Sequence, residues 1–500
     1  MEAFVNRADE LELVEEALET LQDPQRLLRT PLIEFWGIEG MGKSSLLAKI
    51  QERCQHKQLT CLHATLERQS SEQVLVQTRK QLEQQRPLVL LLDALEQQES
   101  EQQGKLEVGL GELSEDSHLF VVLSSRKVER FGGTRALARK LHAYPLGPLD
   151  PASSRAYVEQ VAGERGQEWW EVVYEWTQGY PLAMKVMLEA LMAKPWELDN
   201  PEQQKQLIAR VLERVIEGYV LRGVADMIWY RTMLSLLSVP RRFNLVIMQE
   251  LIEGFAAPDY HLKSRLAYMT IPAQLNEQTQ LLDWDVSKGG YAIEGVIRHL
   301  FLQYLRLRHP EDYRELHQRL AEVNRDLMRQ VHGSDRLRYL REYWYHRVSS
   351  GQTLEQEELA REIEELSQES EELFVQFAEE YKQDQELQQT LGPVASRQVR
   401  SLIEKKLSGV YWKLVQTASE LEGPRYLRLF FSHAARDPEV KNFPALFESV
   451  IGQIEQAQKF GVSDSFLEDL LHDEGISALP NEDFEKLVTF ISKIRSERDR

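Results

Sequence analysis

The sequence predicts an α/β domain built on a parallel sheet, followed by a chain that is almost wholly helical. Over roughly the first 150 residues, short aliphatic runs alternate with helical patterns, which is typical of parallel strands joined by crossover helices. After Asp150 the strand signals fade while the helical periodicity continues. The length of 500 residues fits about three domains with an ordinary buried core.

The alternation predicts three helices and five strands in the first domain. The apolar spacing from Leu11 to Leu21 indicates an amphipathic helix, and helical periodicity recurs over Ser44–Cys54 and Ser71–Gln85. Leu88–Leu92 is continuously aliphatic, as expected of a strand that is buried on both faces. The strands are predicted at Leu32–Trp36, Thr60–Leu66, Leu88–Leu92, Leu119–Ser124 and Leu141–Leu146.

Asp150-Pro151 marks the end of this domain, because an acidic residue followed by proline is a helix start. Further on, helical segments precede Leu281–Val286 and Tyr291-Ala292-Ile293, and another helix follows, which is the outline of a winged helix. The expected domains are 1–149 with the sheet, 150–225 as a helical lid, 226–325 as a winged-helix domain and 326–500 as a helical region for sensing or partner binding.

The last region carries a dense acidic segment, Leu354–Glu386. We interpret it as the solvated face of a long helix, and docking of a basic partner is the alternative. Two apolar clusters beyond it are interpreted mostly as core, with a partner groove as the alternative: Leu427, Leu429, Phe430 and Phe431, then Leu446, Phe447 and Val450.

Composition excludes several classes of protein. The 60 Lys and Arg against 80 Asp and Glu give a net charge of −20, which argues against a broad nucleic-acid surface. The longest aliphatic run is far shorter than the ~20 residues that span a bilayer, so no membrane partner is expected, and the first residues show no signal-peptide pattern. Cys54 and Cys61 are the only cysteines, which excludes a disulfide scaffold and favours a reducing, cytoplasmic location.

The segment Gly37–Ser44 reads Gly-Ile-Glu-Gly-Met-Gly-Lys-Ser and matches the phosphate-loop pattern G-x-x-x-x-G-K-[ST] between a predicted strand and a predicted helix. Its glycines let backbone N–H groups converge on phosphate oxygens, and the helix N-terminus adds a positive dipole end. Lys43 can reach the β- and γ-phosphates, and the Ser44 hydroxyl can ligate Mg²⁺. The pattern predicts ATP or ADP with Mg²⁺ as cofactors, bound by Gly37, Gly40, Met41, Gly42, Lys43, Ser44 and Ser45.

Three candidate catalytic residues follow the strands of the predicted sheet. Asp93 ends the aliphatic strand at the sheet edge where ligands bind, and it can hold Mg²⁺ through water. Glu96, three residues on, is a candidate for polarising the attacking water, and the alternative is a solvated carboxylate of an acidic cluster. Arg126 follows the next strand and would face the γ-phosphate, with an ordinary surface arginine as the alternative.

These motifs together resemble the STAND nucleotidases, the signal-transduction ATPases that include NACHT and NB-ARC proteins. Phe4–Leu11 resembles the F-x-G-R-x-x-E-L opening of that family, with Asn6 where the family usually has Gly. The resemblance implies that Val5 and Arg7 lie against the adenine and ribose. The Asp93–Glu96 stretch is similar to the NACHT-type acidic motif.

Further matches lie outside the phosphate loop. Ser124-Ser125-Arg126 looks like the family's sensor arginine, and Gln178–Ala183 is similar to its G-x-P-L-A signature. In that signature the proline packs against the adenine, which implies this role for Pro181. Glu294 stands where many relatives carry a histidine that touches the ADP β-phosphate, and we interpret both Glu294 and the nearby His299 as structural.

The resemblance, which covers about residues 1–325, implies a switch. Bound ADP would hold a closed monomer, a trigger would open it, and exchange for ATP would expose surfaces for self-oligomerisation, with slow ATP hydrolysis as the reset. Phe4 begins the nucleotide arm at once, so we expect a separate effector protein to supply the output. In bacterial relatives such switches serve antiviral or conflict signalling, and the resemblance carries that context here.

Two alternatives stay open. A nucleotide-regulated transcriptional regulator is motivated by Arg241-Arg242 and by Arg306–Arg347, which holds 10 arginines against 7 Asp and Glu, a surplus of 3. A helix face with internal ion pairs explains that stretch as well. The other alternative is a scaffold that binds nucleotide without turnover.

Overall fold

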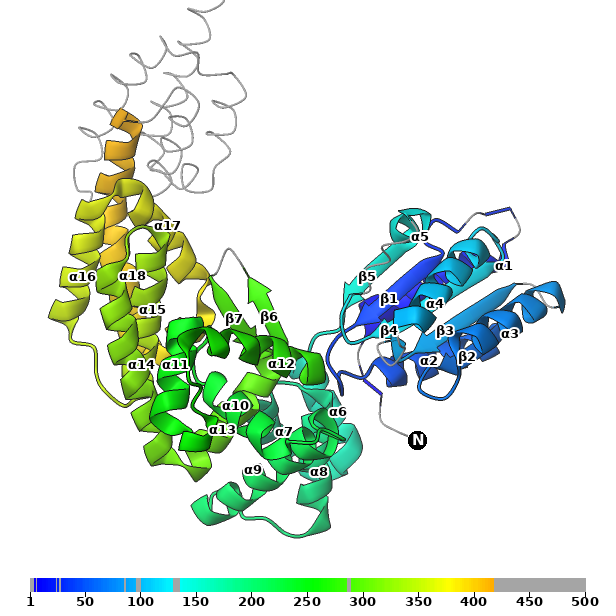
Figure 1. The fold of residues 1–500 in the computed structure, drawn as a ribbon, viewed down its shortest axis with the longest axis horizontal. Coiled ribbons are helices and arrows are strands. Elements are labelled where there is room, and N and C mark those ends of the chain that lie inside the picture. The colour runs from blue at the N-terminus through cyan, green and yellow to red at the C-terminus, as the bar shows by residue number, and fades with distance from the viewer. Residues whose placement is uncertain are drawn as a thin grey trace, which may run out of the picture. The chain divides into compact units, whose positions relative to one another are not determined.

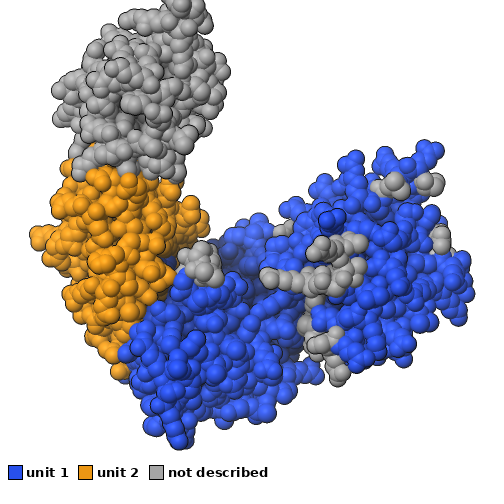
Figure 2. All heavy atoms as spheres, turned by 45° about the horizontal axis from the view of Figure 1, so that its top comes forward, with its two compact units in different colours: residues 1–313 blue, residues 314–500 orange. Residues whose placement is uncertain are grey.

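The computed structural model divides into two compact units, residues 1–313 and residues 314–500 (Figure 2). The structure describes residues 4–5, 7–23, 25–26, 28–84, 87–95, 100–128, 135–285 and 289–417. The boundary expected between residues 325 and 326 lies inside the helix Pro310–Gln330, and the two units divide in the first turn of that helix.

The first unit begins with a five-stranded sheet, formed by β1 (Leu32–Trp36), β2 (Thr60–Thr65), β3 (Leu88–Asp93), β4 (Leu119–Ser125) and β5 (Leu141–Pro145). All neighbouring strands run parallel. Their order across the sheet is β2-β3-β4-β1-β5, so β4 lies between β1 and β3 (Figure 1). Every predicted strand is present, with ends that differ by one residue at most.

Helices cover both faces of this sheet, which confirms the predicted α/β class. The helices are α1 (Ala8–Gln22), α2 (Lys43–His56), α3 (Ser71–Gln84), α4 (Ser100–Leu113) and α5 (Arg135–Lys140). Leucines and valines of β3 and β4 pack with α3, α4 and α5 on one face, and α1 and α2 lie on the other. This is the fold of a P-loop NTPase, in which the glycine-rich loop joins β1 to α2.

The sequence pattern predicts α1, α2 and α3 but misses α4 and α5. Helix α4 carries Gly104 and Gly109, which weaken a helical pattern. At Gly109 the two helices are in close contact, since a Cβ atom there would lie 2.4 Å from Cδ1 of Leu75 on α3 and would displace that side chain. The close approach of α3 and α4 therefore obscures the local signal for α4.

The helices that follow the sheet begin with α6 (Pro151–Ala162), α7 (Gly166–Thr177), α8 (Pro181–Ala193) and α9 (Pro201–Val215), which continues as a π-helical turn over Ile216–Val220. The Asp150 carboxylate accepts from the backbone N–H of Ser153 at 3.0 Å, and Pro151 takes the first helical position. The hydrogen bond from Ser153 holds the pKa of Asp150 below its ordinary value. The helix start predicted here is therefore confirmed.

The rest of the first unit holds α10 (Met227–Leu237), α11 (Leu245–Phe255), α12 (Thr270–Thr279), the antiparallel hairpin β6 (Leu282–Asp285) and β7 (Gly290–Ile293), and α13 (Gly295–Arg308). Three helices, a hairpin and a further helix thus occur in the predicted order. Phe243, just before α11, pairs with Tyr291 of β7, with ring centroids 5.8 Å apart. This contact ties the hairpin to the helices.

The described part of the second unit is helical, which confirms the all-helical prediction for these residues. It holds α14 (Pro310–Gln330), α15 (Ser334–Ser349), α16 (Gln356–Glu369), α17 (Glu371–Gln383) and α18 (Gln385–Thr417). Helix α18 has non-helical backbone angles at Gly392, just before Pro393, where two helices meet at a kink. The acidic segment Leu354–Glu386 lies on α16, on α17 and at the start of α18 rather than on one long helix, because Ser370 is extended and its side chain caps α17.

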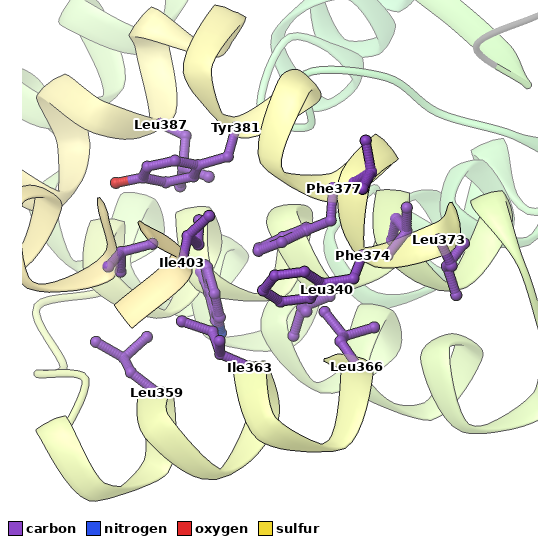
Figure 3. Packing of buried hydrophobic residues seen from close by; sticks show 14 of the residues in the cluster. Leu340, Leu359, Ile363, Leu366, Leu373, Phe374, Phe377, Tyr381, Leu387 and Ile403 are labelled. Carbon is purple, nitrogen blue, oxygen red and sulfur yellow. The ribbon is translucent and has the colours of Figure 1, made fainter. Parts of the chain in front are cut away.

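An aromatic and aliphatic core joins α15, α16, α17 and α18 (Figure 3). Phe374 and Phe377 of α17 lie side by side, and the Phe377 ring meets Trp344 edge-on at 5.8 Å between centroids. The Trp344 indole N–H donates to the Glu362 carboxylate at 2.6 Å. Burial raises the pKa of Glu362 to about 7. The acidic α16 therefore contributes both core leucines and one partly buried carboxylate to this unit.

The predicted apolar clusters at Leu427–Phe431 and Leu446–Val450 lie outside the described residues. Among the helices that the structure does describe, none combines the length and the apolar composition required to cross a bilayer.

Candidate nucleotide-binding site

The phosphate loop has the shape that its sequence predicts. Gly40 and Gly42 have φ of 81° and 89°, in the left-handed region that favours glycine. The Lys43 ammonium donates to the carbonyl oxygens of Gly37 at 2.6 Å and Ile38 at 2.9 Å, so its side chain folds back over the loop. The Ser44 side chain, at the start of α2, is exposed. The loop is therefore a preformed concavity at a helix N-terminus, the arrangement that binds phosphate.

A cavity of about 850 Å³ opens over this loop, which is large enough for a nucleotide. It is lined by most of the predicted site residues, namely Val5, Arg7, Gly40, Met41, Gly42, Lys43, Ser44, Ser45, Asp93, Arg126 and Pro181. Gly37 does not line it, and a Cβ at Gly37 would lie 2.8 Å from the Leu146 carbonyl oxygen. Glu96 lies outside the described residues.

The sequence reasoning missed a second set of lining residues. One face of α8 lines the cavity with residues at helical spacing, namely Pro181, Lys185, Glu189 and Met192. Counting this spacing onward from Pro181 would have predicted the other three as lining residues. The complete set of missed lining residues is Phe4, Glu39, Thr65, Glu67, Ala94, Leu149, Tyr157, Gln160, Val161, Leu182, Lys185, Glu189 and Met192.

Asp93 lies at the carboxyl end of β3, where it is mostly buried. Its Oδ1 accepts from the hydroxyl of Ser124 and from the backbone N–H of Ala94 at 3.0 Å. Ala94 has φ of 62°, so the chain turns sharply away from the strand directly after the carboxylate. Asp93 and the Ser44 hydroxyl line the same cavity, and together they offer the oxygen donors that suit Mg²⁺ alongside phosphate oxygens.

Arg126 follows β4, the strand between those that carry the phosphate loop and Asp93. Its Nη2 donates to Oε2 of Glu39, inside the phosphate loop, at 2.7 Å. Ser125 donates to the buried Glu34 carboxylate of β1 at 2.6 Å, and Lys127 donates to the Asn276 side chain of α12 at 3.0 Å. The end of β4 therefore contacts the phosphate loop and the α12 region through neighbouring side chains.

Arg7 connects the N-terminal arm to the site. Its backbone is left-handed, with φ of 74°, directly before α1. The guanidinium donates from Nη2 to the carbonyls of Met41 at 3.0 Å and Gly147 at 2.7 Å, and Nη1 pairs with Glu10 at 3.2 Å. Arg7 therefore fastens the phosphate loop to the segment that leads into α6, while its side chain also lines the cavity.

The start of α8 is bonded directly to the phosphate loop. The Tyr180 hydroxyl donates to the Glu39 carbonyl at 2.6 Å, and the Leu182 N–H donates to the Gly40 carbonyl at 3.2 Å. Burial, with the nearby Glu39 charge, raises the pKa of the Tyr180 phenol, which keeps it a donor. A Cβ at Gly40 would lie 2.4 Å from the Leu182 Cβ, so the two segments are in close contact.

Glu294 and His299 do not line the cavity among the described residues. His299 lies on α13 with Nε2 2.7 Å from the Glu175 carbonyl of α7. Burial raises the pKa of Glu294.

Comparisons with protein-family models and with curated proteins found no match. Among solved structures, the chain is similar to the RuvB Holliday junction branch migration motor of Thermotoga maritima, with 12% identity and a TM-score of 0.35 over 58% of this chain and 92% of that one. It is also similar to a STAND protein with a tetratricopeptide repeat sensor from Pyrococcus horikoshii, with 13% identity and a TM-score of 0.30 over 100% of this chain and 75% of that one.

A third similarity is to the HORMA:CdnC:Trip13 complex of E. coli MS115-1, with 12% identity and a TM-score of 0.32 over 39% of this chain and 84% of that one. At these identities and TM-scores the likenesses carry no functional argument. The P-loop NTPase fold rests instead on the loop Gly37–Ser44 between β1 and α2 in a five-stranded parallel sheet.

Proposed function

We propose that this chain is an ATP/ADP-operated switch of the STAND type, in which the bound nucleotide sets how α6–α8 lie on the phosphate loop. The observation that carries the proposal is the pair of hydrogen bonds from Tyr180 and Leu182 to the loop, beside a cavity lined by α6, α8 and the loop. A nucleotide in this cavity touches both sides, so ADP and ATP can favour different arrangements of the two.

The cavity lining holds both polar and apolar groups that such a nucleotide could contact. The phosphates would meet the backbone N–H groups of Gly40–Ser45, and Lys43 would exchange two carbonyl partners for phosphate oxygens. Ser44 and Asp93 would hold Mg²⁺, which neutralises phosphate charge when it is bound. The apolar side chains of Val5, Pro181 and several neighbours in the lining provide a surface for the adenine.

The later steps of the switch extend this proposal beyond the site. Slow hydrolysis resets the switch, with Asp93, Glu96 and Arg126 as the catalytic residues. Exchange of ADP for ATP leads to self-oligomerisation and to activation of a separate effector protein in antiviral or conflict signalling. The resemblance of the nucleotide motifs to STAND proteins supports these steps.

The first test identifies the nucleotide and removes its main cation. Heat denaturation of the purified protein should release ADP or ATP, identified by chromatography. Lys43→Ala should raise the Kd of a fluorescent ADP by about 100-fold, because it removes a buried charge from the phosphates, and it should abolish ATP-dependent oligomers in light scattering. Lys49→Ala on the exposed face of α2 is the matched control and should leave both unchanged. If the Lys43 variant binds ADP with the same Kd as the wild-type protein, the switch proposal is wrong.

The DNA-binding alternative gains no support from the arginines of α13–α15. Most of them form ion pairs within the chain, as in Arg306–Glu175, Arg336–Glu369, Arg341–Glu380 and Arg347–Glu358. Fluorescence anisotropy with duplex DNA at low salt tests it, since phosphate contacts would give a steep salt dependence. In the scaffold alternative the chain binds nucleotide without hydrolysing it, and its biological activity does not depend on that binding. Lys43→Ala should then leave the biological activity unaffected.

A further inference from the structure

The phosphate loop contains its own anionic partner for Arg126. Glu39 is the third residue of the loop, and its Oε2 accepts from Nη2 of Arg126 at 2.7 Å. The two side chains are 33% and 20% exposed, so solvent screens the pair only in part. Both residues line the nucleotide cavity. The carboxylate is therefore within reach of the region where the phosphates of a bound nucleotide would lie.

The backbone of Glu39 is held as well as its side chain. The Tyr180 hydroxyl donates to the Glu39 carbonyl at 2.6 Å, and the next carbonyl, of Gly40, accepts from Leu182 at 3.2 Å. Because the peptide is fixed on the α8 side, the carboxylate is presented to Arg126 from a defined position. β1 and β4 are parallel neighbours in the sheet (Figure 1), with Trp36 opposite Ser125. The loop that follows β1 and the arginine that follows β4 therefore leave the sheet at the same edge.

We propose that Glu39 is a built-in competitor of the γ-phosphate for Arg126, so that the phosphate loop itself biases the site toward ADP. This inference rests on the proposed function, since it requires a nucleotide whose phosphates lie on the loop. ADP ends at the β-phosphate and leaves the Glu39–Arg126 pair in place. ATP brings a γ-phosphate that binds Arg126 only by replacing a carboxylate, and the carboxylate then faces a like charge.

The same competition connects nucleotide exchange to α8. Once Arg126 turns to the γ-phosphate, repulsion moves the Glu39 side chain away from the phosphate. Its peptide is the one that Tyr180 holds, so the displacement acts on the hydrogen bond between loop and lid. The ion pair thereby opposes ATP entry, and breaking it loosens the contact of α8 with the loop.

Substitution of the carboxylate tests the proposal. We measure the Kd of ADP and of a non-hydrolysable ATP analogue, both with Mg²⁺, by competition with fluorescent ADP. Glu39→Gln should raise the ratio of the ADP Kd to the analogue Kd by about tenfold, in the range of ordinary coupling energies. Glu39→Asp, with a shorter side chain, should raise the ratio less. The gain should vanish in the double variant with Arg126→Gln, as a double-mutant cycle requires.

Glu67→Gln is the matched control for a general charge effect. Glu67 lines the same cavity and forms no ion pair with any residue that the structure describes, so its removal should shift both Kd values by a similar factor. If Glu39→Gln binds ADP but leaves the ratio of the ADP Kd to the analogue Kd unchanged, the competitor proposal is wrong while the proposed function stands. The same conclusion follows if Glu67→Gln raises this ratio as much as Glu39→Gln does. A wild-type protein that binds neither nucleotide overturns the proposed function together with it. Thermal unfolding identifies any variant that fails to fold, and Glu39→Asp then decides the outcome.

Discussion

The Arg126–Glu39 pair of the candidate nucleotide cavity and the polar contacts in the core of the second unit differ in how deeply they are buried. In the cavity, Arg126 follows β4 and Glu39 lies within the phosphate loop, and both side chains stay partly exposed. In the second unit, His317 and His346 are fully buried, with their Nδ1 atoms 2.8 Å apart, and Glu362 accepts from Trp344 between packed helices. A partly exposed pair on loops can exchange partners with a ligand, whereas a polar contact in a buried core is fixed by the packing around it.

This contrast suggests a division of roles. Substitutions in the cavity should change nucleotide affinity more than stability, and substitutions in the second unit should do the reverse. The three predictions below test that division, beginning with the largest expected effect.

Phe374→Ala should destabilise the second unit by about 3–5 kcal/mol, because it leaves a cavity in a fully buried aromatic core. Hydrogen exchange of α15–α17, followed by mass spectrometry, localises the loss. The Kd of ADP should stay the same. Val394→Ala, at a side chain that is 62% exposed, is the control and should cost less than about 0.5 kcal/mol. A large rise in the ADP Kd of the Phe374 variant would contradict the expectation that the second unit affects stability and not nucleotide affinity.

Glu362→Gln should stabilise the second unit in a pH-dependent way. Burial raises the pKa of this acid from 4.5 to about 7, so the folded state holds the proton more tightly than the unfolded one. Stability therefore falls as the pH rises from about 4.5 through about 7, where the acid ionises in its folded environment. The amide keeps an acceptor for Trp344 and removes the charge, with an expected gain of about 2–3 kcal/mol at pH 8.

Urea unfolding of the second unit at pH 5 and pH 8, followed by hydrogen exchange, measures this gain. Near pH 5 the gain should be small, because the acid is already protonated in the folded state. Glu365→Gln on the exposed face of the same helix should show no such pH dependence. Equal effects of Glu362→Gln at both pH values would contradict the raised pKa.

Tyr180→Phe should have the smallest effect of the three substitutions, and it should change the affinity for ADP rather than the stability of the second unit. It removes the hydroxyl that donates to the Glu39 carbonyl, a loss of about 1 kcal/mol. We expect a roughly fivefold higher Kd for ADP, because the loop and α8 are then less well preorganised. Tyr174→Phe on α7 is the matched control. Unfolding of the second unit without a change in ADP affinity would be the opposite of the expected result.

Much of the site could be predicted from the sequence because its signals are local. The glycines of the loop, the aliphatic run before Asp93 and the proline of α8 each occur within a few residues of the group that they position. The strand ends follow from the same runs, and a parallel sheet brings those ends to one edge.

Contacts between distant segments gave no comparable signal. Glu39 is 87 residues from Arg126 and 141 from Tyr180, and each residue alone fits an ordinary loop or helix start. Helix α4 was missed for a related reason, since Gly109 serves its packing against α3 and weakens its own pattern. In the second unit, helical periodicity predicts the helices but not which buried polar groups meet, such as His317 and His346.

Four consecutive residues at the end of β4 contact four separate parts of the first unit. Ser124 contacts Asp93, Ser125 contacts Glu34 of β1, Arg126 contacts the phosphate loop and Lys127 contacts α12. Each side chain in this run contacts a different neighbour, so a substitution at any of the four removes a contact with a different segment. A designed change at one of these positions is therefore best paired with a change at its distant partner, 31 residues away for Ser124 and 149 for Lys127.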